Sequence, residues 1–138
     1  MTGSSRENGG PSLRVEARRA PPRAVGVNRG EIWWADVGQL FGSAPGDRRP
    51  VLILQADSFN RSRIQTVVVV PLSTNTGLAL APGNVRCRPR ETGLEKASVA
   101  NVSQLTVVDR GRLAEKAGVL SARLLTQVED GVRQALGL

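Results

Sequence analysis

The sequence predicts a small, mainly β barrel followed by a C-terminal helix. Two observations favour strands: residues 51–54 and 67–70 are continuous runs of valine, leucine and isoleucine, each short and bounded by turn-forming residues. A third favours a helix, because apolar side chains between residues 121 and 138 recur three and four positions apart. With 138 residues, the chain is expected to form one domain around one modest core.

The first half of the chain supplies most of the expected strands. Residues 31–36 (EIWWAD) alternate and place a tryptophan on each face of a strand. Residues 37–48 hold three glycines and a proline, so we expect a long exposed loop before the strand at 51–54. Residues 56–63 are polar and turn-like, and 67–70 form the next buried strand.

The second half is expected to continue with a polar loop at 73–84 and a strand at 85–88. Residues 98–108 read as two further strands, separated near Ser103 and Gln104.

Two helices should follow. Asp109 is expected to be the N-cap of a short helix that ends at Gly118, and Ser121 the N-cap of the C-terminal helix. The apolar stripe of that last helix comprises Leu124, Leu125, Val128, Val132 and Leu136.

Five or six short strands close best as a small barrel, because closure removes exposed edges. We therefore expect an SH3-like barrel over residues 27–138. Residues 1–26 contain Gly-Gly-Pro and Pro-Pro and lack apolar periodicity, so they are expected to be a disordered N-terminal extension.

Charge and residue types narrow the chemistry. The net charge is +7, with nineteen basic side chains and no histidine. Basic charge favours RNA or acidic protein partners, although GC-rich codon usage would enrich arginine as well. The lone Cys87 excludes an intrachain disulfide and is expected to pack in a strand. Without histidine, imidazole catalysis and the commonest metal ligand are absent, so no cofactor is expected.

The chain has no run of about 18 apolar residues, which a spanning helix would need. Its N-terminus does not look like a secretory signal either. A cytoplasmic protein without membrane contact is expected.

Several segments, taken in order, resemble the MazF/PemK family of toxins. They are residues 29–36 (RGEIWWAD), 42–43 with 46 (GS and G), 48–53 (RRPVLI), 69–75 (VVPLSTN), 82–85 (PGNV), 98–104 (SVANVSQ) and 136–138 (LGL). Each piece alone is weak, but their order and spacing over residues 28–138 make the resemblance specific.

The resemblance implies a barrel of the MazF/PemK/CcdB type, a homodimer, and sequence-selective cleavage of single-stranded RNA. The expected substrate is mRNA, with tRNA and rRNA as further substrates, so that translation and growth stop. It also implies neutralisation by a MazE-like antitoxin with an acidic segment.

RNA cleavage without metal or histidine leaves one economical route, attack by the ribose 2′-OH on its own 3′-phosphate. Arg49 enters a buried strand from the loop and matches the family's catalytic arginine, so we assign it to phosphate stabilisation. A solvated charge or a salt bridge to Asp47 is the alternative. Ser73 matches the family's catalytic threonine, and Thr74 could share its role. A turn-forming hydroxyl pair is the alternative for both.

The residue types do not identify a general base that would take the 2′-OH proton. Asp47 is the nearest carboxylate and is our candidate. Some relatives carry glutamate where this chain has Ala44, and many carry aspartate where it has Ala97. These two alanines keep open a catalytically weak, antitoxin-binding module.

RNA binding is assigned to basic residues, to an aromatic in the first loop, and to polar residues of the matching segments. They are Arg29, Arg48, Arg86, Arg88, Phe41, Asn75 and Gln104. The two tryptophans are expected mainly in the core and the dimer interface. A CcdB-like gyrase-binding toxin is a further alternative, but that class relies on a C-terminal tryptophan and this chain ends in Gly-Leu.

Overall fold

The computed structural model describes residues 26–36 and 47–138. The predictions for Phe41, for Ala44 and for the extension at 1–25 lie outside these residues. The elements, in chain order, are β1 (Glu31–Asp36), β2 (Arg48–Ile53), α2 (Asp57–Asn60), β3 (Thr66–Ser73), η1 (Thr76–Leu80), β4 (Val85–Cys87), α3 (Pro89–Thr92), β5 (Ser98–Ala100), η2 (Val102–Gln104), β6 (Thr106–Asp109), η3 (Arg110–Arg112), β7 (Leu113–Val119) and α4 (Ala122–Leu136).

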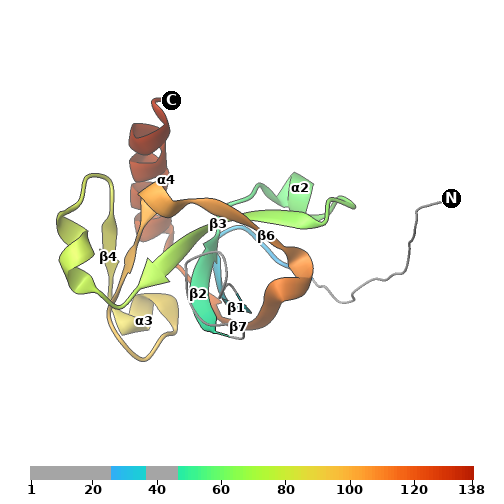
Figure 1. Ribbon diagram of the computed structural model, residues 1–138, viewed down its shortest axis with the longest axis horizontal. Helices are drawn as coiled ribbons and strands as arrows, with labels where there is room; N and C mark the ends of the chain where they lie inside the picture. The colour runs from blue at the N-terminus through green and yellow to red at the C-terminus, as the bar shows by residue number, and fades with distance from the viewer. Residues whose placement is uncertain (1–25, 37–46) are drawn as a thin grey trace, which may run out of the picture.

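The described strands form one curled antiparallel sheet in the order β4-β5-β3-β2-β1-β7. The long strand β3 organises it: β2 pairs along one edge, while β5 and β6 follow each other along the other. Figure 1 shows these strands curving into a half-barrel, with α4 standing to one side next to β4. The predicted mainly β barrel with a C-terminal helix is confirmed.

Two hydrophobic clusters lie on opposite faces of the sheet. One contains Ile32, Leu52 and Val70 together with Leu124, Val128 and Val132 of α4. The other contains Ala35, Val51, Ile53, Val67 and Val69. Successive residues of β1, β2 and β3 alternate between the clusters, which explains why the valine-rich runs lack a polar face.

The C-terminal helix begins as predicted, because the Ser121 hydroxyl accepts a hydrogen bond from the Leu124 amide. Leu124, Val128 and Val132 are buried, but Leu136 is 56% exposed and does not belong to the core stripe. Gly131 allows the helix to approach the chain before β4, because a Cβ at this position would collide with the Gly83 carbonyl oxygen. In the described chain, no helix is long and apolar enough to cross a membrane.

The helix predicted from Asp109 to Gly118 is wrong, because residues 113–119 form β7 instead. This strand pairs with β1 and carries two register shifts, so its side chains do not alternate regularly. Because apolar and polar residues do not alternate in this segment, the sequence contained no sign of a strand there. Asp109, a common helix N-cap residue, favoured a helix instead. The structure therefore has seven strands in the described chain, where five or six were predicted.

Smaller boundary errors have local causes. The first loop was predicted through residue 48, but β2 already begins at Arg48, where it pairs with Asp36. Leu54 follows β2 rather than belonging to it. The turn-like segment 56–63 contains the short helix α2, and the loop at 73–84 contains η1.

Candidate active site

A hollow of about 740 Å³ opens between β1, β2, β3, β7 and the segment that joins α3 to β5. This size is within the range of about 300–1,000 Å³ typical of ligand sites. We call it the β2–β7 pocket. Its charged lining residues are Arg48, Arg49, Lys96, Lys116, Glu95 and Glu115. Four cations against two carboxylates favour an anionic ligand.

Strand pairing brings the two principal predicted residues into this pocket. Val51 of β2 pairs with Pro71 of β3, and the same antiparallel register carried two residues further places Arg49 opposite Ser73. Both side chains line the pocket, as does Thr74. A guanidinium and a hydroxyl from neighbouring strands thus face one ligand space, which would suit a phosphate.

Arg49 forms an exposed ion pair with Asp47, with Nε 3.2 Å from Oδ2. The side chains of Arg49 and Asp47 are 44% and 39% exposed. A pair of this exposure contributes only about 0–1 kcal/mol, so a phosphate can compete with Asp47 for the guanidinium. The salt bridge that the sequence offered as an alternative therefore exists, without removing Arg49 from the pocket.

Ser73 and Asn75 organise the turn after β3. The Ser73 hydroxyl accepts a hydrogen bond from the Asn75 amide at 3.1 Å, and the Asn75 side chain accepts one from the Gly77 amide. Both bonds are the local kind expected of turn-forming residues. Because the Ser73 oxygen accepts in this bond, its own proton can still be donated to a ligand.

Arg48 and Arg49 both line the β2–β7 pocket, although neighbouring residues on a strand start toward opposite faces. Arg48 also lines a second hollow, of about 600 Å³, with Asp36, Asp109 and Arg112. The long arginine side chain thus joins the two hollows.

Arg29 does not lie at the pocket. Its guanidinium donates to the Leu54 carbonyl oxygen and to Glu129 of α4, and its backbone amide donates to Asp57 at 2.7 Å. Because these bonds connect β1 to α4 and to the chain after β2, the side chain has a structural role in this arrangement.

Four other residues predicted to bind RNA do not line the pocket. Arg86 is exposed on β4, and Arg88 is exposed near Glu91, 3.8 Å from its carboxylate. Gln104 is exposed at the end of η2, and the Asn75 side chain caps η1. None of these four is among the pocket's lining residues.

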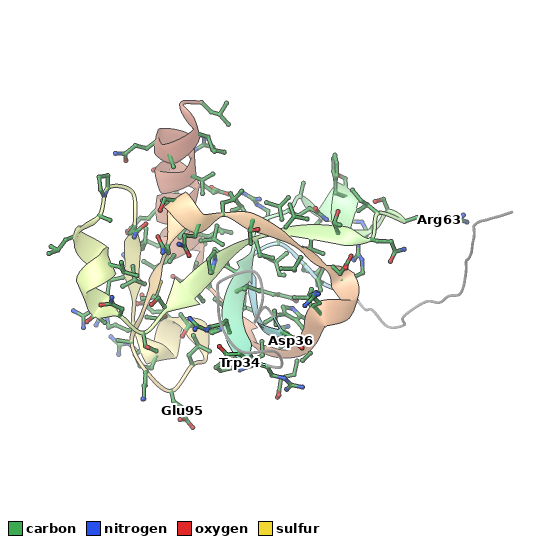
Figure 2. The ribbon with its side chains drawn as sticks, viewed as in Figure 1. Trp34, Asp36, Arg63 and Glu95 are labelled. Carbon is green, nitrogen blue, oxygen red and sulfur yellow. The ribbon has the colours of Figure 1, made fainter. Side chains whose placement is uncertain are left out.

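Sequence reasoning missed several residues of the pocket. Glu115 and Lys116 reach it only because β7 pairs with β1, where Trp34 stands opposite Glu115. Ser98 reaches it through the pairing of β5 with β3 and β4. The alternation at 31–36 could have shown that the side chains of Trp33 and Trp34 start toward opposite faces of β1. It could not have shown which element packs against either face. Figure 2 shows Trp34 and Glu95 toward the same lower edge of the molecule.

Two buried groups near the pocket have shifted pKa values. Burial raises the pKa of Glu31, but hydrogen bonds from Trp33, Asn28 and Lys116 outweigh it, so the value is lowered. Burial, together with the charge of Glu91, raises the pKa of Cys87 to about 11. Cys87 is a protonated packing residue, as predicted.

The comparisons with known proteins agree on a single family. The model of the PemK-like, MazF-like toxin of type II toxin–antitoxin systems matches residues 28–136. Endoribonuclease MazF6 of Mycobacterium tuberculosis is 40% identical over 112 residues, which cover 81% of this chain and 98% of the relative. Endoribonuclease EndoA of Bacillus subtilis is 30% identical over 112 residues, covering 81% and 96%.

Solved structures with the same fold include toxins alone and with a partner. Mycobacterium tuberculosis toxin MazF-mt6 superimposes with a TM-score of 0.63 at 25% identity, covering 78% of this chain and 97% of that one. A mycobacterial endoribonuclease in complex with its cognate antitoxin gives 0.66 at 22% identity, covering 81% and 96%.

Proposed function

The chain belongs to the PemK-like, MazF-like toxin family of type II toxin–antitoxin systems, and we propose that it cuts single-stranded RNA in the β2–β7 pocket. Its curated relatives are endoribonucleases, and the chain is a toxin endoribonuclease of the same kind. The observation that supports this location is that Arg49 and Ser73, from paired strands, line one cationic pocket.

The proposed reaction needs only groups of the RNA and of this chain. The 2′-oxygen of the ribose forms a bond to its own 3′-phosphorus while the bond from phosphorus to the 5′-oxygen breaks. The 2′-OH proton passes to a base, and the departing 5′-oxygen takes up a proton. The products are a 2′,3′-cyclic phosphate and a 5′-OH end. Because the nucleophile belongs to the substrate, positioning supplies much of the acceleration.

Arg49 would stabilise the charge that builds on the non-bridging phosphate oxygens, since its guanidinium matches two oxygens at once. The Ser73 hydroxyl, and Thr74 next to it, would donate to the same phosphate and hold it against Arg49. Asp47, already 3.2 Å from Arg49, is the carboxylate proposed to accept the 2′-OH proton.

Binding of the longer RNA and of a protein partner would use the charge around this pocket. Arg48 lies between the two hollows and would hold a neighbouring phosphate. An acidic antitoxin segment would compete with RNA for the same cations, as suggested by the solved relative bound to its cognate antitoxin. A homodimer acting in the cytoplasm completes the proposal.

The test is cleavage of a long RNA by purified protein in excess EDTA, with both new ends mapped. We expect cyclic-phosphate and 5′-OH ends, and no cleavage of an RNA carrying a 2′-O-methyl at the scissile ribose. Cleavage that needs a divalent ion, or that continues at the methylated ribose, would overturn the mechanism. If no RNA is cut at all, the weak antitoxin-binding alternative replaces the proposal.

A further inference from the structure

One buried polar group at the β2–β7 pocket has no role in the reaction above. Ser98 is 1% exposed on β5, and within the described part of the chain its hydroxyl has no hydrogen-bond partner. Buried hydroxyls are nearly always paired, because an unpaired one has lost its water without replacement. Since Ser98 also lines the pocket, a bound ligand could supply the missing partner.

The surroundings of Ser98 are apolar. The pocket lining includes Trp34, Pro50, Leu72, Leu94 and Ala117 besides the charged residues. Leu72 and Ala117 belong to the hydrophobic cluster or pack against it, and Trp34 is only partly buried, so its ring remains available to a ligand. Trp34 and Pro50 stand opposite each other on β1 and β2, so the pocket has an apolar surface there in addition to its charged residues and the Ser98 hydroxyl.

A nucleobase has the complementary chemistry, with apolar faces and a polar edge. We propose that the apolar part of the pocket holds the base next to the cleaved phosphate and that the Ser98 hydroxyl hydrogen-bonds its edge. Trp34 provides the surface on which the base stacks. Rotation about the Ser98 Cα–Cβ bond turns the hydroxyl toward the base. This inference rests on the proposed function, and it assigns Ser98 to sequence selection rather than to bond breaking.

The position of Ser98 relative to Arg49 supports this division. Ser73 pairs with Val99, the residue after Ser98, and the β2–β3 register, carried two residues beyond Val51 and Pro71, places Arg49 opposite Ser73. Because successive side chains of a strand start toward opposite faces, Ser98 starts from the face that carries Leu72, whereas Ser73 starts from the other face. Both line the pocket, so a base and its phosphate would be held by side chains from the two faces.

The test compares wild type with Ser98→Ala on an RNA library randomised around the cleavage site. We expect wild type to prefer one base strongly at one position and Ser98→Ala to lose about tenfold of that preference there. Cleavage of the disfavoured sequences should persist. The melting temperature of Ser98→Ala should be equal or higher, because the substitution removes an unpaired buried hydroxyl. Ser98→Thr keeps the hydroxyl and should retain the preference.

Cys87→Ala is the matched control, because Cys87 is buried opposite Ser98 on β4 but does not line the pocket. It should lower stability and leave the base preference unchanged. If Ser98→Ala cleaves with an unaltered preference, or if Cys87→Ala alters it equally, the inference is overturned while the nuclease function stands. A wild-type protein that cuts no RNA would instead defeat the proposed function itself.

Discussion

Two arginines at strand entrances, Arg29 before β1 and Arg49 in β2, occupy very different surroundings. Arg29 donates to the Leu54 carbonyl oxygen and to Glu129, a residue 100 positions away in the chain. Arg49 pairs with Asp47, only two positions away, and both are substantially exposed. Buried long-range partners make an arginine part of the fold, whereas an exposed arginine that lines a pocket can also reach a ligand.

Arg49→Ala should give the largest effect on activity. Loss of a preorganised donor to a developing anionic charge typically costs about 10²–10³ in rate. The free energy of unfolding should change far less than the activity, because the Arg49 side chain is 44% exposed and its ion pair with Asp47 is solvated. Single-turnover cleavage and thermal unfolding measure the two quantities. A variant that cuts as fast as wild type would remove Arg49 from the proposed site.

Arg29→Met should show the reverse pattern. The substitution keeps much of the apolar stem but leaves Glu129 and the Leu54 carbonyl without their donor, which should lower the free energy of unfolding by about 2 kcal/mol. Below the unfolding temperature, the cleavage rate per folded molecule should match wild type. Denaturant unfolding and single-turnover cleavage measure these effects. A rate loss as large as that of Arg49→Ala would mean that Arg29 contacts RNA.

Glu31→Gln should give the smallest effect, one that depends on pH. The folded-state pKa of Glu31 lies below its ordinary value of 4.5, so the ionised carboxylate stabilises the fold above that pH. This contribution is lost as pH falls through the lowered pKa. The variant should therefore melt below wild type at neutral pH, with the difference narrowing at acid pH. Melting temperatures from pH 7 down to acid pH measure this, and a constant difference would exclude ionisation of Glu31 as the cause.

The parts of the fold that sequence could predict are those with a regular local signal. The continuous aliphatic runs predicted β2 and β3. The capping residue Ser121 and the apolar stripe that follows it predicted where α4 begins. Strand β7 could not be predicted, because its register shifts against β1 remove the two-residue period. A bulged strand is defined by its partner, which a local pattern does not contain.

The residues of the candidate site also fall into those that a local sequence signal could predict and those that it could not. Arg49 and Ser73 were found because they lie in short segments that match the family, and the structure brings them to one pocket. Arg29 belongs to an equally clear segment, but its partner Glu129 comes from the far end of the chain. Glu115 lies in no matching segment, and Ser98 lies in one without any sign that it reaches the pocket, since each reaches it only through strand pairing.

The pairing of the first strand with the last has a consequence for synthesis. Trp34 of β1 and Ala117 of β7 line the same pocket. Because the ribosome synthesises β1 long before β7, the site is completed only late in synthesis. Until β7 has emerged and paired with β1, no such pocket exists. A growing chain therefore lacks Glu115, Lys116 and Ala117, the part of the lining that β7 supplies, until its synthesis is nearly finished.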